Sequence, residues 1–480
     1  MFNTQLIDLL KSVPQEWLDE ADLYLQSRFH NRGQRYHDIC TLFKILKPFH
    51  PDYDHPSLER TEIYAQLFPG QEIIKGKLEK VISDTLGLLR SFLLHQHYNR
   101  PENNFQHAMD WAQMLRTLGK AEKYEHFMEK AKQDLFTDSN FSNKYFLQKL
   151  QFEYEILSWR NMNNTTKGDI NLANTFSALL NYYEVARLEL SNLLLIQQKF
   201  TTVAPTDEIL VAINQLPLLA TDQNIMLEIS TKINQLLKNE QPSLDDFYYL
   251  MNLLLIHEKK IAPLTLRDYY TYLRNVCSLL INKGDATIFP VLHQLQRDNL
   301  NRGYLTINGK LHILALSNIN RVALFVGNVD WAIAFVEEYK DRLFGDQNLN
   351  DYYLLNKALC HFARKEFDEA LSLLPHTLNN FVNHLIARRL EIMCYYETRS
   401  EILLSKLDAF KVYVWRASNK SLSPAMQDAN KSFVNLLYQL ITTQPGDNAK
   451  LKRLLAKLEN PKDIAEYSWL SAKITALMKK

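Results

Sequence analysis

The sequence contains little glycine and little proline. Glycine occurs 12 times and proline 15 times, so they form 27 of the 480 residues, about half of their average usage. The tight turns of β-sandwiches and β-barrels depend on these residues, as do the glycine-rich loops that cradle phosphate groups. The shortage therefore argues against a β architecture and against nucleotide chemistry built on such loops.

The sequence also lacks an excess of charge of one sign, closely spaced cysteine pairs and long apolar runs. The 55 basic and 54 acidic side chains give a net charge of +1, so nothing draws the whole chain to nucleic acid or acidic lipid. The four cysteines form no CxxC pair, which predicts buried thiols in a reducing compartment. The first residues lack a basic signal-peptide region, and the longest apolar candidate, Tyr248–Ile256, is too short for a membrane span. Together these absences predict a soluble, cytoplasmic protein.

What the sequence does contain is helical periodicity in consecutive short segments. Four segments carry apolar residues at i, i+3, i+4 and i+7, and they form two successive pairs: Ile319–Val326 with Ala332–Tyr339, and Leu355–Phe362 with Phe367–Leu374. Ala332 and Ala370 hold the same place in the two pairs and lie 38 residues apart. This step is within the range of helix-pair repeats, about 34 to 47 residues. Such short one-sided helices must stack on neighbours to bury their apolar stripe.

Helix signals continue along the whole chain, with roughly twenty or more helices and no convincing strand. Helix starts are predicted at Ser12–Gln15, Ser243–Asp246, Thr265–Asp268 and Ser423–Pro424. The longest helix is predicted at about Asp169–Phe200, and the polar segment Asn99–Asn104 is the best candidate for a domain boundary.

We therefore predict an all-α fold, in which helical hairpins stack as an α-solenoid behind an N-terminal helical unit. Residues 1–98 form the N-terminal helical domain, and residues 104–480 form the α-solenoid. The tetratricopeptide-like repeats are clearest at residues 309–420, and capping helices occupy residues 447–480.

The second helix pair is similar to a tetratricopeptide repeat. Ala358, Phe367 and Ala370 match its small, aromatic and small positions, which let two helix backbones approach closely. The match is partial, because His361 stands where that motif usually has tyrosine and no proline closes the repeat.

The chain as a whole resembles a family of uncharacterised bacterial helical-repeat proteins. The resemblance covers most of the length and rests on these landmarks: Phe29-His30-Asn31, Leu67-Phe68-Pro69-Gly70, Ser83-Asp84 with Phe92-Leu93, Tyr182-Tyr183, Asn318 with Gly327 and Asp330-Trp331-Ala332, and Trp469-Leu470. It implies an α-solenoid and brings no activity, ligand or catalytic residue with it.

No motif of known chemistry is present. The chain has no GxxxxGK[ST] or GxGxxG loop, no GxSxG turn and no HExxH helix. The histidines and cysteines do not cluster with the spacing of a metal site. We therefore predict no enzymatic activity, no cofactor and no metal.

Five Tyr-Tyr doublets, several with a cation nearby in the sequence, are the first functional candidate. Adjacent residues on a helix point about 100° apart, so one tyrosine of a doublet packs while the other reaches a groove. Space filling between helices is the other interpretation. The predicted partner-binding residues are Tyr182, Tyr183, Arg187, Tyr248, Tyr249, Tyr269, Tyr270, Tyr352, Tyr353 and Lys357. Arg267 and Arg274 are further cations near doublets, and Tyr395-Tyr396 is the fifth doublet.

A basic C-terminal stretch is the second candidate. Ala449–Lys480 holds eight basic and three acidic residues, and its leucines at 451, 454, 455 and 458 form one stripe. This pattern is typical of a helix that caps a solenoid, and contact with nucleic acid is the alternative. The leading prediction is thus a non-enzymatic scaffold or adaptor that binds a protein or peptide on the solenoid surface. A nucleic-acid-associated regulatory protein that uses the basic C-terminal helices is the alternative function, although nucleic acid is an unlikely partner.

Overall fold

A computed structural model describes most of the chain, and it is helical almost throughout. The described residues are 4–137, 141–163, 168–200, 224–239, 242–282, 285–345, 348–375, 381–416, 424–444, 446–458 and 464–479. These ranges contain 22 α-helices, in agreement with the predicted all-α class. They also contain three short strands, so the prediction of no strand was wrong at that point.

The chain divides into two compact units. Unit 1 comprises residues 1–138 and 151–172, and unit 2 comprises residues 139–150 and 173–480. Unit 1 therefore continues beyond the polar segment Asn99–Asn104. The prediction of an N-terminal helical domain at residues 1–98 stays a prediction.

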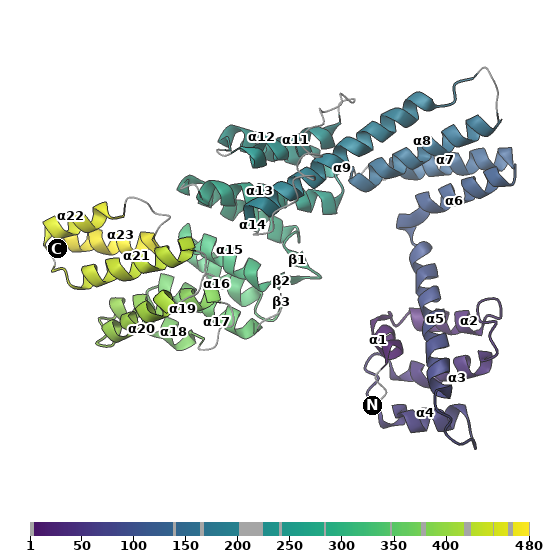
Figure 1. Cartoon of the computed structure of the whole chain (residues 1–480), viewed down its shortest axis with the longest axis horizontal. Helices are drawn as coiled ribbons and strands as arrows, with labels where there is room; N and C mark the ends of the chain where they lie inside the picture. Colours follow the sequence, from purple (N-terminus) through teal and green to yellow (C-terminus); the bar gives the residue numbers. More distant parts are fainter. Residues whose placement is uncertain are drawn as a thin grey trace. The chain divides into compact units, whose positions relative to one another are not determined.

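The first part of unit 1 is a small bundle around one long helix. Its helices are α1 (Gln5–Ser12), α2 (Trp17–Gln26), α3 (Tyr36–Leu46), η1 (Lys47–Phe49), η2 (Pro56–Leu58), α4 (Arg60–Leu67) and α5 (Lys77–Tyr98). Helices α1, α2 and α3 all contact α5 (Figure 1). Leu89 and Phe92 of α5 are at most 2% exposed and lie in the same apolar cluster as Phe43 of α3. The apolar stripe of α5 therefore organises this bundle.

The second part of unit 1 is a helix pair with the start of a third helix. It contains η3 (Pro101–Asn103), α6 (Asn104–Thr117), α7 (Ala121–Thr137) and most of α8 (Asn143–Asn163), whose first turns belong to unit 2. Gly119 links α6 to α7 with a φ of 64°, a left-handed conformation that glycine adopts without strain. The carboxylate of Glu155 receives a hydrogen bond of 2.7 Å from Nε of Arg116.

Unit 2 is a succession of helices that follow each other in space as they do in sequence. Its elements are α9 (Leu172–Phe200), α11 (Ile225–Lys238), α12 (Leu244–His257), η4 (Glu258–Lys260), α13 (Pro263–Asn282), η5 (Ala286–Ile288), α14 (Phe289–Asn301), α15 (Ile313–Phe325), α16 (Val329–Glu338), α17 (Leu349–Ala363), α18 (Phe367–Leu373), α19 (Phe381–Glu397), α20 (Leu403–Arg416), α21 (Pro424–Ile441), α22 (Asn448–Ala456) and α23 (Tyr467–Met478). The longest of these, α9, agrees with the prediction of a long helix at about Asp169–Phe200 to within three residues.

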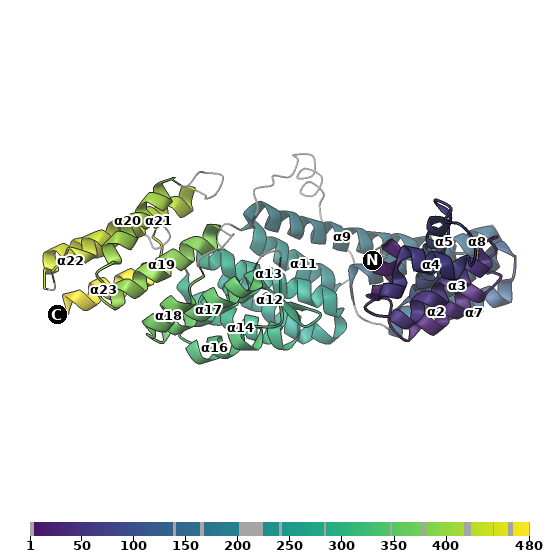
Figure 2. The ribbon, with the colours of Figure 1, turned by 90° about the horizontal axis from the view of Figure 1, so that it is seen from below.

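Each helix from α11 to α23 contacts the next one, and several contact the next but one. Contacts of the second kind join α11 to α13, α15 to α17, α17 to α19 and α21 to α23. Figure 1 shows α13 to α17 following each other in this order, and Figure 2 shows the same part of unit 2 from below. The four stripes of the sequence pattern are in the core: Ala323, Ala332, Ala358 and Ala370 are each 0% exposed. These alanines allow the paired helices to approach closely.

The same turn joins the helices of three successive pairs. Gly327, Lys365 and Arg399 have φ values of 80°, 67° and 56° and follow α15, α17 and α19. The residue after each of them donates its backbone N–H to a carbonyl five residues back, at 2.9 to 3.0 Å, as in a Schellman motif. The turns are 38 and 34 residues apart (365 minus 327, and 399 minus 365).

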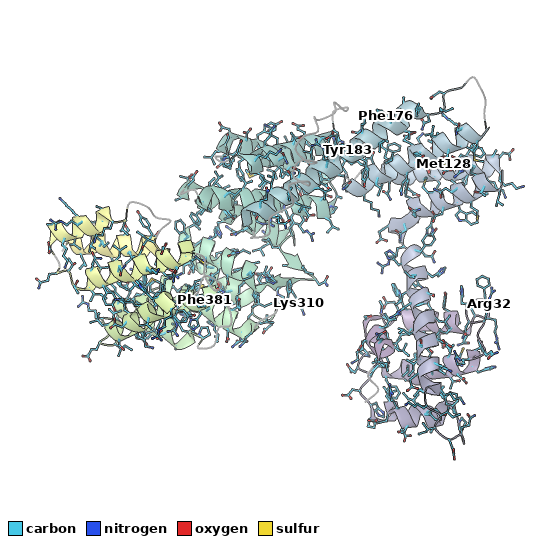
Figure 3. All side chains as sticks on the ribbon, in the orientation of Figure 1. Arg32, Met128, Phe176, Tyr183, Lys310 and Phe381 are labelled. Atoms are coloured by element: carbon cyan, nitrogen blue, oxygen red, sulfur yellow. The ribbon has the colours of Figure 1, made fainter. Side chains whose placement is uncertain are left out.

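A three-stranded sheet interrupts the helices between α14 and α17. Strand β1 (Thr306–Ile307) pairs antiparallel with β2 (Lys310–His312), and β2 pairs parallel with β3 (Leu343–Phe344). The hairpin turns at Asn308 and Gly309, both with positive φ, and its strands are too short for an alternation pattern to reveal. Lys310 lies at the edge of this hairpin (Figure 3).

Buried amides connect the helices behind the apolar core. Nδ2 of Asn320 on α15 donates to the backbone carbonyl and to Oδ1 of Asn356 on α17, at 3.1 and 3.0 Å. Nδ2 of Asn234 on α11 donates 2.9 Å to Oδ1 of Asn192 on α9. All four side chains are at most 7% exposed. Such paired buried amides fix the position of one helix against the next.

Helix starts were predicted with mixed success. Ser243 accepts a hydrogen bond from the N–H of Asp246, as predicted, and Pro424 is the first residue of α21, while Ser423 lies outside the described residues. Ser12 instead ends α1, and its hydroxyl donates to the carbonyl of Leu9. Thr265 lies inside α13, which begins at Pro263 because proline fits the first turn without losing a hydrogen bond.

The four cysteines are free thiols and are buried, as predicted: Cys40, Cys277, Cys360 and Cys394. Among the described helices, none is both long enough and apolar enough to cross a membrane.

Candidate functional site

The predicted partner-binding tyrosines divide by exposure. Four are at most 5% exposed and pack within the core of unit 2: Tyr269, Tyr270, Tyr352 and Tyr353. The other four are half-buried or exposed: Tyr182, Tyr183, Tyr248 and Tyr249. Tyr183 projects from α9 near Phe176 (Figure 3). Space filling between helices accounts for the first group, and partner binding stays a prediction for the second.

Tyr353 and Lys357 form a closed polar cluster with Glu337. The Tyr353 hydroxyl lies 3.0 Å from both oxygens of Glu337, and the Lys357 ammonium lies 2.6 Å from Oε1. Burial opposes ionisation of Glu337, but the hydrogen bonds from Lys357 and Tyr353 outweigh it, so the pKa of this carboxyl is below its usual value. The cluster joins α16 to α17 and leaves its groups occupied with each other.

The remaining predicted residues lie in separate places. Arg187 pairs with Glu184 on the same helix, at 2.6 Å, with both side chains at most 10% exposed. Tyr248 and Tyr270 line one apolar cavity of about 420 Å³ between α12 and α14. Tyr249 instead donates a hydrogen bond to Glu228, at 2.5 Å. The structure therefore brings one tyrosine from each of two doublets, Tyr248 and Tyr270, to one cavity and places Tyr249 and Arg187 outside it.

A groove of about 690 Å³ runs along the helices that open the successive pairs of unit 2. Side chains of α13, α15, α17 and α19 line it, together with residues of α14 and the start of α23. The groove thus crosses several helix pairs, as a site for an extended ligand requires.

Two arginines in this groove form no ion pair with a carboxylate of the described residues. Arg274 on α13 donates to Asn299 and, at 2.8 Å, to the hydroxyl of Thr271, which are both uncharged. Arg321 on α15 makes no hydrogen bond or ion pair with the described part of the chain, and its side chain is open to water. Protein atoms nevertheless surround both guanidiniums, and this desolvation lowers the pKa of Arg274 to about 10 and that of Arg321 below its usual value. The carboxylate of Glu466, which lines the same groove and is hydrogen-bonded to Arg389, partly offsets this effect at Arg321. Arg274 and Arg321 are thus groove cations without an ion pair of their own in the described residues.

Amide and aromatic groups lie beside these arginines. Asn275 and Asn318 line the groove, and neither side chain has a hydrogen-bond partner among the described residues. The side-chain carbonyl of Gln296 is buried without a partner in those residues. Phe289 and Phe325 stack at 3.8 Å between ring centroids and form an apolar part of the wall. The groove therefore offers cations, free amides and rings on one surface.

The C-terminal end of the groove is closed by the α19–α23 contact cluster, which consists of Arg389, Glu397, Asn430, Glu466, Trp469 and Lys473. Arg389, 8% exposed, donates 2.9 Å to Glu466 and 2.7 Å to Asn430. Glu397 accepts 2.8 Å from the Trp469 ring N–H and 2.7 Å from Lys473. Glu466 is thus already paired, and it is the one carboxylate that lines the groove.

Sequence reasoning missed most of the groove residues. Arg274 was noted only as a cation near a tyrosine doublet, and Arg321 and Asn275 were not singled out. A usable signal does exist, because Asn318, Arg321 and Phe325 share one face of α15 at i, i+3 and i+7. Arg274, Ser278 and Ile281 share one face of α13 at i, i+4 and i+7. Polar residues that repeat on one face of consecutive apolar helices indicate a lined groove.

The basic C-terminal helices are partly engaged in packing. Leu451, Leu454 and Leu458 are buried, whereas Leu455 is 40% exposed. Lys457 donates 2.6 Å to Gln439, and Lys473 pairs with Glu397. These contacts agree with packing against α21 and α19, and nucleic-acid binding stays a prediction. Within the described ranges, no three His, Cys, Asp or Glu side chains are arranged to hold a metal ion.

Comparison with known proteins identifies no relative. No protein-family model matches the chain, and no curated protein or solved structure matches it either. The resemblance to bacterial helical-repeat proteins therefore stays a prediction, and the functional argument rests on the groove.

Proposed function

We propose that this chain is a tetratricopeptide-like α-solenoid that binds an extended acidic segment of a partner protein in the groove of unit 2. The repeat assignment is supported by the contacts between successive helices and by equivalent turns at 38- and 34-residue steps. Short helix pairs that stack in sequence form continuous grooves along their first helices, and such grooves suit extended ligands.

The observation that carries the proposal is the pair of arginines without carboxylate partners. A guanidinium that has lost part of its hydration is stabilised most by an anion, because the anion balances its charge and accepts its hydrogen bonds. The two arginines lie on different helices, α13 and α15, and Arg274 alone bonds Thr271 and Asn299. An extended segment with two separated acidic groups matches this arrangement better than a single phosphate does.

Other polar groups that line the groove suit a peptide backbone. A free asparagine amide offers one donor group and one acceptor, which is what a peptide unit needs to be held in extended form. Asn275 and Asn318 are placed for this role, and the unpaired carbonyl of Gln296 is a further acceptor. The stacked rings of Phe289 and Phe325 provide a surface for an apolar side chain. The chemistry is therefore binding, and the proposed protein is not an enzyme.

The test is peptide binding to the full-length chain, measured by fluorescence anisotropy. A panel of labelled nine-residue peptides with two acidic residues at varied spacing, leucine between them and a free carboxylate is compared with matched peptides in which glutamine replaces the acids. We expect the best acidic peptide to bind and Arg321→Gln to weaken it about tenfold, since a charge-assisted hydrogen bond contributes about 1.5–3 kcal/mol. Arg321 has no partner in the described residues, so its replacement leaves the fold intact.

A matched control is Arg267→Gln, since Arg267 lies on α13 but outside the groove and pairs with the exposed Asp268. This variant should bind like the wild type. Equal affinity for acidic and glutamine peptides, or an Arg321→Gln variant that binds as tightly as Arg267→Gln does, would refute the proposal.

A further inference from the structure

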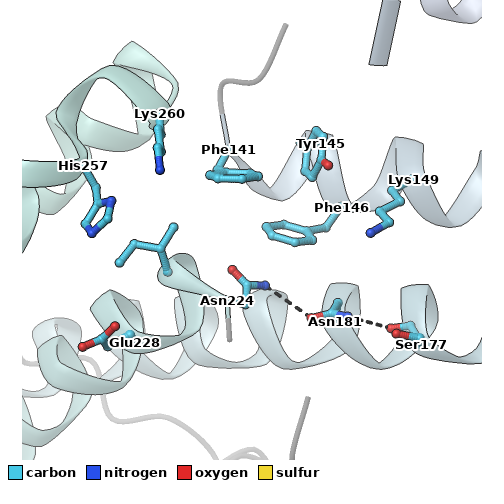
Figure 4. A pocket seen from close by; sticks show the side chains of 11 residues that line it. Phe141, Tyr145, Phe146, Lys149, Ser177, Asn181, Asn224, Glu228, His257 and Lys260 are labelled. Atoms are coloured by element: carbon cyan, nitrogen blue, oxygen red, sulfur yellow. Dashed lines mark hydrogen bonds between the residues drawn. The ribbon is translucent and has the colours of Figure 1, made fainter. Parts of the chain in front are cut away.

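A second cavity in unit 2, distinct from the groove, has a different lining. It has a volume of about 860 Å³, within the usual range for small-molecule sites, and lies among the start of α8, α9, α11 and the end of α12. Figure 4 shows the side chains that line it. None of them lines the groove described above.

Backbone hydrogen bonds hold two opposite walls of this cavity together. The N–H of Phe141 donates 2.7 Å to the carbonyl of Lys260, and the N–H of Ala262 donates 3.0 Å to the carbonyl of Phe141. This pair of bonds makes a parallel bridge between the segment before α8 and the segment after α12. Phe141 and Lys260 are therefore fixed as neighbours, however their side chains rotate.

One wall is aromatic. Phe141 lies 5.3 Å from Tyr145 with the rings edge to face, and 6.2 Å from Phe146 with the rings near parallel. Tyr145 and Phe146 are at most 9% exposed, so they are held firmly, whereas Phe141 is half-buried. Burial raises the pKa of Tyr145, so its hydroxyl keeps its proton at neutral pH. The wall offers flat apolar faces and one phenolic donor.

Cationic groups face this wall. Lys149 and Lys260 line the cavity, and neither ammonium pairs with a carboxylate in the described part of the chain. In Figure 4 Lys260 extends toward the space between His257 and Phe141, and Lys149 ends beside Phe146. His257 is a third basic group of the lining. The single lining carboxylate, Glu228, is exposed and accepts the hydrogen bond of Tyr249.

The amides of the lining are occupied with each other. Nδ2 of Asn224 donates 3.4 Å to Oδ1 of Asn181, and Nδ2 of Asn181 donates 2.9 Å to the carbonyl of Ser177. Asn224 also caps α11 by accepting from the N–H of Met226. These bonds keep the lower wall rigid and leave the rings and the cations as the groups available to a ligand (Figure 4).

From this juxtaposition we infer that the cavity binds a small molecule that carries an anionic group on or next to an aromatic ring. The ring stacks on Phe141 and Phe146, and the anion lies within reach of Lys149 and Lys260. A purely apolar ligand would leave two ammonium groups without a counter-charge, and a purely ionic one would leave the aromatic wall uncovered. The aromatic contact alone and the ionic contact alone each give weak binding, and their combination makes the cavity selective for a ligand that carries both groups.

The experiment titrates phenyl phosphate into the full-length protein, with saturation-transfer NMR and calorimetry as readouts. Inorganic phosphate and benzyl alcohol are the matched probes that each lack one component of the ligand. We expect phenyl phosphate to bind at least about tenfold more tightly than either of them. Equal binding of benzyl alcohol, or no saturation transfer to phenyl phosphate, overturns the inference.

Variants assign the binding to this cavity. Lys260→Met and Lys149→Met should each weaken phenyl phosphate about threefold to tenfold, the range of one charged contact near a surface. Lys259→Met is the control, because Lys259 is the exposed neighbour of Lys260 and does not line the cavity. Phe141→Leu should remove the preference for phenyl phosphate over inorganic phosphate, and this half-buried position tolerates the change better than Phe146 does. If Lys259→Met and Lys260→Met weaken binding equally, the site is elsewhere and the inference fails.

This result is separable from the proposed function. Arg321→Gln should leave phenyl phosphate binding unchanged, and Lys260→Met should leave acidic-peptide binding unchanged. An acidic peptide that displaces phenyl phosphate would show that the cavity takes protein segments, which overturns the small-molecule inference alone.

Discussion

Two arginines of unit 2 have the same chemistry but very different neighbours. Arg389, in the α19–α23 contact cluster, is 8% exposed and bound to Glu466 and Asn430. Arg321, in the groove, is open to water and has no hydrogen bond or ion pair with the described residues. The first guanidinium holds helices together, and the second is available to a ligand. Residue type alone does not distinguish these roles, because they depend on the groups that the fold places next to each arginine.

The largest expected effect comes from breaking the paired arginine. Glu466→Gln leaves the buried guanidinium of Arg389 without its counter-charge, and we expect the free energy of unfolding to fall by about 3 kcal/mol. Arg321→Gln should change it by no more than about 0.5 kcal/mol, because that side chain is exposed and interacts with the charge of Glu466 without forming an ion pair or hydrogen bond in the described structure. Urea denaturation of both variants measures the difference.

Glu338→Gln serves as the control for this pair, since Glu338 bonds Arg342 at 2.7 Å in an exposed i,i+4 pair. Such surface pairs contribute about 0.3–0.5 kcal/mol. If Glu466→Gln lowers the free energy of unfolding by no more than Glu338→Gln does, the two arginines do not differ in what they contribute to stability.

Acid tests a second buried basic group of unit 2, His293 of α14, which contacts Asn328 and Trp331. Burial, and then Arg297, lower the pKa of His293 below 6.5, so the folded state favours the neutral ring. The stabilisation is complete above pH 6.5 and is lost as the pH falls through the folded-state pKa, by at most about 1.4 kcal/mol per pH unit. His293→Gln should therefore flatten the pH dependence of the urea midpoint between pH 7 and pH 5.

The Gln side chain retains an acceptor for Asn328, which bonds the His293 ring at 3.1 Å. His384 has a lowered pKa as well and contributes equally to both proteins, so the difference between them reports His293 alone. Parallel pH curves for wild type and variant would rule out this role of His293.

The smallest expected effects concern the equivalent turns after α15 and α17. Lys365 holds a φ of 67°, which costs a side-chain-bearing residue energy, so Lys365→Gly should raise stability by about 0.5 kcal/mol. Gly327→Ala should lower it by about 1 kcal/mol. A Cβ at Gly327 would meet no atom within 4 Å, so the cost there comes from the backbone alone. Thermal melting of both variants tests whether the turns are equivalent, and shifts of the same sign would show that they are not.

Helical periodicity predicted the helices well and the site poorly. The stripes that include Ala332 and Ala370 are buried as their spacing requires, because a core-facing stripe is a local property of the chain. The groove depends on which helix faces lie opposite each other, and this is a tertiary property. A Tyr-Tyr pair looks the same in the sequence whether it is buried, as at Tyr352, or exposed, as at Tyr248, so partner binding by the doublets stays a prediction. The short β1–β2 hairpin was missed because its strands, two and three residues long, carry no periodicity.

The amide pair between α15 and α17 has a mechanical consequence. Asn320 and Asn356 are both 0% exposed, and Nδ2 of Asn356 also donates to Ser317, at 3.0 Å, and to the carbonyl of Tyr352, at 2.8 Å. If one helix slid past the other by a turn, the bonds of Asn356 to Asn320 and Ser317 would be lost, at about 1–3 kcal/mol for each buried group left unpaired, whereas the bond to Tyr352 lies within α17 and would remain. Under tension the two helices would therefore separate in one step and not by gradual sliding. This part of the chain would resist extension up to a defined rupture force.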